Sequence, residues 1–190
     1  MINILKENRV IKGNKNRDIV IFDLDDTIVV TDAKIKVVDP KTDKVIKSMT
    51  PAEFNQYEKN PKHVLSFEDF ESPEILKQGK LIHSIFRQLK KFYKRGIPVA
   101  IITARSSSEL VRNFFLMHGI DIHRELVIAV NDPQYGYTGT VEQKKQQAML
   151  EIIDKGFVWV YFFDDHTKNL KAAKEIEKLR DGVEIKTIKV

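Results

Sequence analysis

Residues 18–27, D-I-V-I-F-D-L-D-D-T, are the stretch around which the rest of the chain is interpreted. Residues 19–22 are a short apolar run rich in β-branched side chains, which is typical of a strand buried on both faces of a sheet. Three carboxylates follow directly, on Asp23, Asp25 and Asp26. Because carboxylates are almost never fully buried without a partner, we expect the chain to leave the core at Asp23.

The spacing of Asp23 and Asp25 predicts a metal site. Side chains two residues apart in an extended chain point the same way, so these two can converge while Leu24 returns to the core. The carboxyl end of a central strand is where open α/β sheets bind ligands. Carboxylates held this close repel unless a cation lies between them, and Mg²⁺ prefers oxygen ligands. The alternative, an acidic turn at a strand end, explains D-x-D-D-T after an apolar strand less well.

Composition limits the class of protein. A chain of 190 residues fits one domain, or one domain with a modest insertion. Its 42% hydrophobic and 31% charged residues are ordinary for a globular protein. The absence of cysteine excludes disulfides and thiolate metal ligands and is compatible with a reducing, cytoplasmic location. The N-terminus M-I-N-I-L-K-E-N-R-V has no long apolar stretch, so neither a signal peptide nor a membrane partner is expected.

The net charge of +5 favours anionic partners such as phosphate esters or nucleic acid. Lysines scattered over solvated faces would give the same net charge, so the net charge does not decide between an anionic partner and an ordinary solvated surface. Residues 1–17 are expected to be a polar lead-in with a short β segment near Ile11. A solvated tail is the favoured interpretation of this segment over a nucleic-acid-binding one.

Residues 33–71 are expected to form an insertion after the first strand. Partial alternation over residues 33–48, around the turn formers D-P-K-T-D, predicts a β-hairpin. The sequence T-P-A-E at residues 50–53 is a capping box that opens a short helix, which Pro61 ends at the latest. Residues 64–67 are a candidate strand. Packing inside the insertion, rather than stacking on substrate, is the favoured role of its aromatic residues Phe54, Tyr57, Phe67 and Phe70.

Helices and strands are expected to alternate through the rest of the chain. A helical region begins at Ser72, and a long amphipathic helix carries one apolar stripe and ends at Gly96. The stripe consists of Leu81, Ile85, Leu89 and Phe92. Further strands are predicted at residues 99–102, 126–130, 157–163 and 183–190, and helices at residues 107–118, 140–154 and 168–179. This order predicts an α/β fold with a Rossmann-like parallel sheet flanked by helices.

Polar residues follow three of the predicted strands. Right-handed crossovers place every carboxyl end of a parallel sheet on one edge. Thr103 and Arg105 would therefore meet Asp23 there, together with the pair Asp164 and Asp165. Carboxylates, a hydroxyl and a lysine around a divalent cation suit phosphoryl transfer, because a carboxylate can attack phosphorus while the cations offset charge on the phosphate oxygens.

These motifs resemble those of the haloacid dehalogenase (HAD) superfamily of phosphohydrolases, over about residues 18–190. The family's first motif, D-x-D-x-T after a strand, is matched by residues 23–27. Its second, an apolar strand ending in Thr or Ser, is matched by residues 100–103, and its fourth, paired acids after a strand, by residues 162–165. The third motif is a lysine, for which Lys144 and Lys145 both qualify. Lys145 is favoured because inward-facing positions then follow it.

The resemblance implies roles for the acidic residues. Asp23 would be the nucleophile and a Mg²⁺ ligand, and Asp25 would be the general acid and base and bind the metal through its backbone carbonyl. Asp164 would complete the metal shell, with Asp165 assisting through water or the lysine, and Asn169 would support the acidic loop. The presence of Asp25 implies phosphatase rather than dehalogenase chemistry, because dehalogenases of this superfamily lack that acid.

The resemblance also implies residues that contact the substrate. Thr103 would hydrogen-bond the transferring phosphate and Lys145 would stabilise its charge, with Thr27 and Lys144 as further substrate-binding candidates. The segment T-A-R-S at residues 103–106 looks like the T/S-x-R segment of polynucleotide phosphatase domains, in which the arginine helps to bind substrate phosphate. Arg105 is therefore a substrate-binding candidate as well.

The function implied is a Mg²⁺-dependent phosphomonoester hydrolase with an aspartyl-phosphate intermediate. Nucleic-acid or nucleotide 3′-phosphates are one substrate class, and small phosphometabolites and phosphoproteins are the others. The resemblance implies that the insertion at residues 33–71 is the flap or minimal cap of this family, whose members with a minimal cap tend to act on bulky substrates because nothing seals the site. A non-catalytic phosphate-binding module remains an alternative, and hydrolysis cannot be separated from phosphotransfer. A response-regulator receiver is disfavoured, because its phosphoacceptor closes the third strand and here the paired acids follow the fourth.

Overall fold

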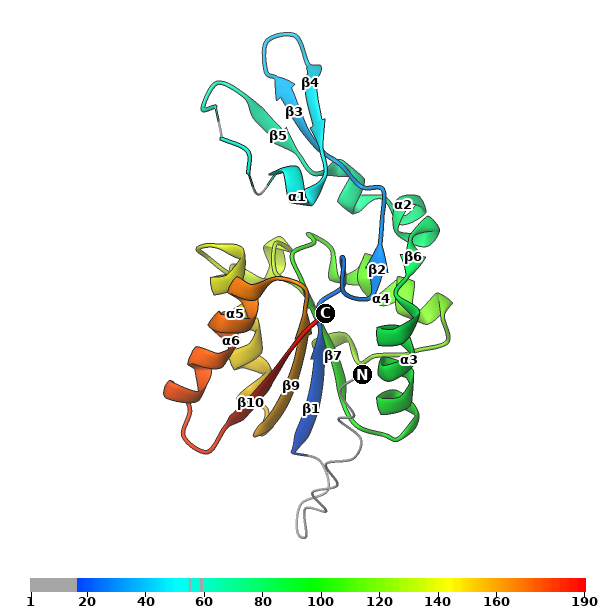
Figure 1. The fold of residues 1–190 in the computed structure, drawn as a ribbon, viewed down its shortest axis with the longest axis vertical. Helices are drawn as coiled ribbons and strands as arrows, with labels where there is room; N and C mark the ends of the chain where they lie inside the picture. The colour runs from blue at the N-terminus through cyan, green and yellow to red at the C-terminus, as the bar shows by residue number, and fades with distance from the viewer. Residues whose placement is uncertain (1–16, 55, 59) are drawn as a thin grey trace.

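A parallel sheet of five strands forms the centre of the protein, in the order β10-β9-β1-β7-β8 (Figure 1). The computed structural model describes residues 17–54, 56–58 and 60–190. The β segment expected near Ile11, and all but the last residue of the expected lead-in, lie outside them. The strands are β1 (Asp18–Phe22), β7 (Val99–Thr103), β8 (Val127–Ala129), β9 (Trp159–Asp164) and β10 (Glu184–Lys189). The predicted α/β fold with a helix-flanked parallel sheet is confirmed.

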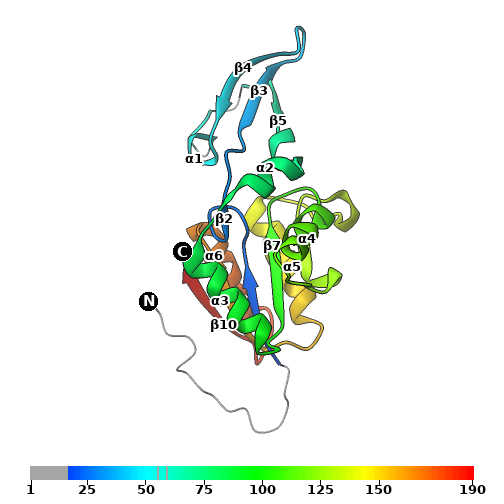
Figure 2. The same cartoon turned by 90° about the vertical axis from the view of Figure 1, so that its right-hand side faces the viewer.

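Helices cover both faces of this sheet (Figures 1 and 2). Side chains of α3 and α4 share one apolar cluster, and those of α5 and α6 share the other. Their bounds are α3 (His83–Lys94), α4 (Ser108–Met117), α5 (Val141–Ile153) and α6 (Thr167–Glu175), with short 3-10 turns at η3 (Arg124–Leu126), η4 (Pro133–Tyr135) and η5 (Ile176–Lys178). Among the described residues, none of the helices has the length and apolar character needed to cross a membrane.

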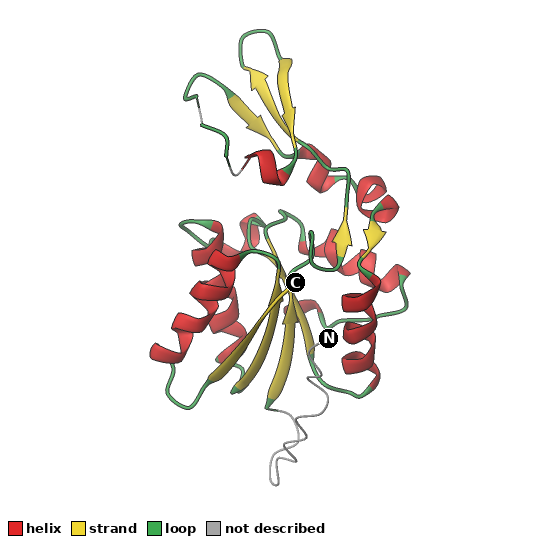
Figure 3. Cartoon of the chain, viewed as in Figure 1, coloured by secondary structure: helices red, strands yellow, loops and turns green. Residues whose placement is uncertain are grey.

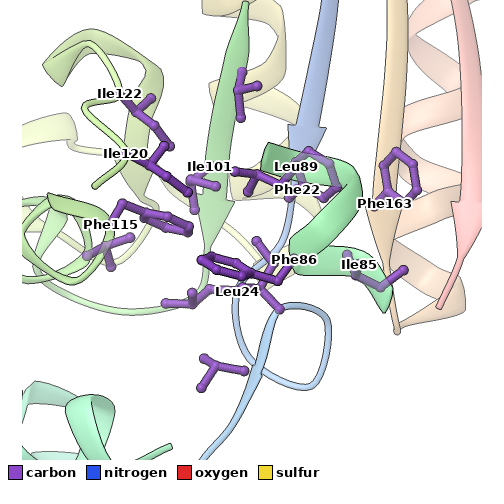
Figure 4. Close-up of a cluster of buried hydrophobic side chains, with 14 of the residues drawn as sticks. Phe22, Leu24, Ile85, Phe86, Leu89, Ile101, Phe115, Ile120, Ile122 and Phe163 are labelled. Carbon is purple, nitrogen blue, oxygen red and sulfur yellow. The ribbon is translucent and has the colours of Figure 1, made fainter. Parts of the chain in front are cut away.

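Strand β1 contributes side chains to both apolar clusters, because successive side chains point to opposite faces of the sheet. Val20 and Phe22 point into the cluster on the α3 and α4 side, where Phe22 stacks on Phe163 of β9 with ring centroids 4.6 Å apart (Figure 4). Ile19 and Ile21 point into the cluster on the α5 and α6 side. Because side chains alternate along a strand, the next position of the second set, Asp23, faces α5.

The insertion, residues 33–71, stands beyond the carboxyl ends of the parallel strands (Figures 1 and 3). The predicted hairpin is present, and the candidate strand at residues 64–67 is present as β5, which joins the hairpin as a third strand in the order β4-β3-β5. Its elements are β3 (Ile35–Asp39), β4 (Lys44–Met49), α1 (Pro51–Phe54), β5 (Val64–Ser66) and η2 (Glu68–Glu71). The capping box is also present: the Thr50 amide donates to Glu53 Oε2 at 2.7 Å, and the Glu53 amide donates to Thr50 Oγ1 at 3.2 Å.

The insertion has a small apolar core of its own. Ile35, Val37 and Met49 are buried there. Phe54, Tyr57, Leu65 and Phe70 pack against them. The expected packing role therefore holds for three of the four aromatic residues. Phe67 is 44% exposed and makes an edge contact with the Phe54 ring.

The single stripe predicted from Leu81 to Phe92 is wrong at its start. Helix α2 (Pro73–Gln78) stops at Gly79, and β6 (Lys80–Leu81) pairs antiparallel with β2 (Val29–Val30) before α3 begins. The Ile82 amide donates to the Ile28 carbonyl at 2.8 Å. The backbone of residues 80–82 thus pairs with residues 28–30 instead of continuing a helix. The rest of the stripe, from Ile85 onward, is buried in α3 as predicted.

Gly79→Ala is expected to lower the free energy of unfolding by about 1–3 kcal/mol, because it overpacks this junction. A Cβ at position 79 would lie 2.5 Å from Cγ2 of the buried Val29 and 3.0 Å from Cγ2 of Thr31. Chemical unfolding of the variant measures the cost. In a Val29→Ala background the same substitution should cost much less, since the methyl group that it meets is gone. Equal costs in both backgrounds would contradict this explanation.

Candidate active site

The three central strands end on the side of the sheet that faces the insertion (Figure 3), and polar side chains gather at these ends. Asp23 follows β1, Asp164 ends β9 and Thr103 ends β7, and β1 pairs with both of those strands. All three side chains are buried. Such burial of two carboxylates requires compensation from neighbouring groups.

Lys145 of α5 supplies that compensation. Its Nζ lies 2.7 Å from Asp23 Oδ1 and 2.8 Å from Asp164 Oδ2. The helix that carries it begins behind Thr140, whose amide donates to the Gln143 side chain at 2.9 Å. Lys145 is only 3% exposed, so its ammonium lies between the two carboxylates with little contact to solvent.

The balance of charge in this group remains negative when both acids are ionised. Burial raises the pKa of Asp23 to about 8, with Lys145 acting to lower it and Asp164 to raise it further. Burial alone would lower the pKa of Lys145, but the two carboxylates raise it above its usual range. One ammonium thus faces two buried acids, so an added cation would be favourable here.

The donor set fits a hard divalent cation. One carboxylate oxygen from each of Asp23, Asp164 and Asp165 lies within 4.8 Å of the others. The Asn169 side-chain amide donates to both oxygens of Asp164, at 2.9 and 3.0 Å, and the His166 amide donates to one at 2.7 Å. Asp165 is half-buried, and burial followed by the Asp164 charge raises its pKa. A set made only of oxygen ligands is what Mg²⁺ prefers.

The Asp25 carboxylate lies beside this group and binds Arg105. Its Oδ2 accepts from Arg105 Nε at 3.0 Å, and its Oδ1 accepts from Nη2 at 2.7 Å. Thr103 Oγ1 lies 3.5 Å from Asp25 Oδ2. The carboxylate for which the family resemblance implies acid–base chemistry therefore lies next to Thr103, which the resemblance implies as a phosphate-binding residue. Metal contact through the Asp25 backbone carbonyl stays a prediction.

The remaining substrate-binding candidates lie at the same strand ends, in different settings. Thr27 is fully buried, with its Oγ1 3.4 Å from Asp23 Oδ2 and accepting from the Asp165 amide at 3.1 Å. Lys144 Nζ lies 2.8 Å from Asn131 Oδ1, outside the buried group. Of the two adjacent lysines, it is Lys145 that the structure places between the acids.

Sequence reasoning missed three groups at this edge. Asn131 links Lys144 to the Ala104 carbonyl, and Lys189, at the end of β10, donates to the Asp165 carbonyl. Asn131 follows a strand and Lys189 ends one. Both could therefore have been predicted from the rule that the carboxyl ends of parallel strands meet at one edge of the sheet. The third is the backbone carbonyl of Phe70, which accepts from Arg105 and leaves no signal in a sequence.

Comparison with known proteins yields a fold but no family. No protein-family model matches the chain, and no curated protein matches it. A chain of a solved structure described as "Structure of Pnkp1/Rnl/Hen1 complex" is similar, with a TM-score of 0.53 and 16% sequence identity. The match covers 94% of this chain and 47% of that one, so this chain spans about half of its length. At this identity the likeness shows a shared fold.

Proposed function

We propose that the chain is a Mg²⁺-dependent phosphomonoester hydrolase in which Asp23 is the nucleophile. The observation that carries this proposal is the buried Lys145 ammonium, within 2.8 Å of both Asp23 and Asp164 at the carboxyl edge of the sheet. An ammonium in that place can hold a phosphate oxygen and offset charge that develops during transfer. Residues 18–190 would be the catalytic domain, with the insertion as its minimal cap.

The proposed reaction has two steps that share the same groups. Asp23 attacks phosphorus, the bond from phosphorus to the ester oxygen breaks, and the departing oxygen takes a proton from Asp25. Asp25 then takes a proton from a water molecule whose oxygen attacks the aspartyl-phosphate, which releases phosphate and restores Asp23. Lys145 and the Thr103 hydroxyl hold the oxygens of the transferring group in both steps.

Asp23, Asp164 and Asp165 would hold Mg²⁺. When bound, the ion supplies positive charge that offsets the charge on the phosphate oxygens. It would also relieve the repulsion between the buried carboxylates of Asp23 and Asp164.

Nucleic-acid or nucleotide 3′-phosphates are the substrates that we propose. The resemblance of residues 103–106 to polynucleotide phosphatase segments supports them, as do the net charge of +5 and the fold shared with a chain of the Pnkp1/Rnl/Hen1 complex. Small phosphate esters are the second candidate, and the contacts of Arg105 favour them. Three of the five N–H groups of that arginine bond protein groups, so it is less available to an oligonucleotide phosphate than the sequence segment suggests.

Phosphate release that stops with EDTA is the expected result of the first assay. The panel consists of an aryl phosphate, oligonucleotides phosphorylated at the 3′ or 5′ end, nucleoside monophosphates and sugar phosphates. We expect the 3′-phosphorylated oligonucleotide to react fastest. Preference for a small ester would contradict the proposed substrate, and no release from any of them would contradict hydrolysis.

Mg²⁺ binding can be measured separately from activity. At a free Mg²⁺ concentration 100 times its dissociation constant, the ion should stabilise the fold by about 2.7 kcal/mol. Asp164→Asn should remove most of this stabilisation, which thermal unfolding detects.

A further inference from the structure

Arg105 joins the candidate acid–base carboxylate to the insertion. Its Nε and Nη2 bond the two oxygens of Asp25, and its Nη1 donates to the Phe70 carbonyl at 2.6 Å. Each of the three guanidinium nitrogens therefore has a protein acceptor. Arg105 is only 2% exposed, whereas the Asp25 side chain that it binds is 24% exposed.

The segment around Arg105 contacts the end of the insertion at a second point. Ser106 Oγ donates to Glu71 Oε1 at 2.7 Å. The Phe70 ring lies 5.6 Å from the guanidinium and packs against the small core of the insertion. A continuous set of contacts thus runs from that core through Phe70 and Arg105 to Asp25.

We propose that Arg105 is a positioning residue that orients Asp25 and links this orientation to the placement of the insertion. The inference rests on the proposed hydrolase function. A guanidinium is a planar fork that fixes the plane of a carboxylate when it binds both oxygens. A carboxylate has about four lone-pair sites, so the two taken by Arg105 leave sites for proton exchange with substrate and water.

This role differs from that of a phosphate ligand. Three of the five N–H groups of Arg105 already have protein acceptors and the guanidinium is buried, so a substrate phosphate would have to use the two remaining N–H groups or displace Asp25 or the Phe70 carbonyl. As a positioning residue it keeps both contacts and acts on the proton that Asp25 transfers. The two roles therefore predict different dependence on the leaving group.

The test compares two esters in single-turnover reactions with Arg105→Ala. An alkyl phosphate needs a proton on its leaving oxygen, whereas 2,4-dinitrophenolate leaves without one. We expect release of the alcohol to slow about 100-fold, the low end of what acid–base catalysis contributes. Release of the phenolate, and inhibition by inorganic phosphate, should each change by less than about 5-fold, because neither depends on that proton. Arg105→Lys should restore only part of the lost rate, since an ammonium cannot bind both carboxylate oxygens as a fork.

Arg112 provides the matched control. It lies in the middle of α4 and also binds a carboxylate and a backbone carbonyl, Asp121 at 2.6 Å and Ile122 at 3.2 Å. Arg112→Ala should leave both release rates unchanged. Equal slowing of both esters by Arg105→Ala, with at least about 10-fold weaker inhibition by phosphate, would make Arg105 a phosphate ligand and overturn the proposal. Unchanged alcohol release would overturn it as well.

A second measurement does not require activity. If Arg105 links Asp25 to the insertion, both Arg105→Ala and Asp25→Asn should speed amide hydrogen exchange over residues 68–72, and Arg112→Ala should not. Unchanged exchange in the first two variants would overturn the link. If the wild-type chain hydrolyses neither ester, the proposed function fails, and the exchange result alone then decides whether the link exists.

Discussion

Asp23→Asn is expected to abolish phosphate release, with a loss of at least about 10⁴-fold in turnover. The amide cannot attack phosphorus to form an aspartyl-phosphate, and the proposed mechanism gives the neighbouring carboxylates other roles. Asp164 binds Lys145 and Asn169, and Asp25 binds Arg105. Turnover of the best ester from the substrate panel, measured with saturating Mg²⁺, gives the result.

The fold of this variant should survive. Burial already raises the pKa of Asp23, so a neutral side chain of the same shape suits the site. We expect the melting temperature to shift by less than about 4 °C, which corresponds to about 1–2 kcal/mol for a chain of this size. Wild-type turnover in Asp23→Asn would contradict the proposed mechanism.

Asp26→Asn is the matched control for Asp23→Asn. Asp26 lies in the same loop with a φ of 57°, a conformation that asparagine tolerates well. The substitution removes the same charge without touching the nucleophile. Turnover within about 3-fold of the wild type would show that the loss in Asp23→Asn comes from the missing nucleophile rather than from altered charge in the loop.

The sequence could predict the parallel sheet and the grouping of the acids, because both follow from short-range patterns. An apolar run such as residues 19–22 is a local feature, and the carboxyl ends of parallel strands share one edge whatever the loops do. The position of Asp23 needed nothing more than this rule and the alternation along β1. The choice between Lys144 and Lys145 depended on which position of α5 faces inward, and periodicity favoured the one that the structure places between the acids.

What the sequence could not predict depends on contacts between distant segments. The break at Gly79 arises because residues 80–82 bind the backbone of residues 28–30, and helical periodicity alone hides such pairing. The third strand of the insertion joins β3 by backbone bonds of the same kind. Arg105 was identifiable as a candidate site residue, but its acceptors include the Phe70 carbonyl, and a main-chain atom carries no residue identity.

Lys145→Met is expected to lower both activity and stability. Methionine keeps much of the length of the side chain but removes the charge that lies between Asp23 and Asp164. Removing one member of a buried ionic group leaves uncompensated charge, which costs about 3–5 kcal/mol. The loss of a charged donor to the transferring phosphate should reduce turnover about 10²–10³-fold. Chemical unfolding and turnover on the same preparation measure the two effects.

A second substitution separates these effects. In Lys145→Met with Asp164→Asn, one of the two facing charges is gone, so much of the lost stability should return while activity stays low. Mg²⁺ should also restore part of the stability of Lys145→Met alone, since a cation can take over the charge balance, but it should not restore turnover. Recovery of activity along with stability would mean that Lys145 serves the fold and not the reaction.

Lys144→Met distinguishes the two lysines directly. Lys144 contacts a neutral amide, so its loss should lower stability by less than about 1 kcal/mol. If Lys144→Met lost turnover as severely as Lys145→Met is expected to, while Lys145→Met lost only stability, Lys144 would be the catalytic lysine. The burial of Lys145 between two carboxylates argues for the opposite outcome. Uncharged residues in place of all three ionised groups would often be equally or more stable, so stability alone does not explain the buried ammonium.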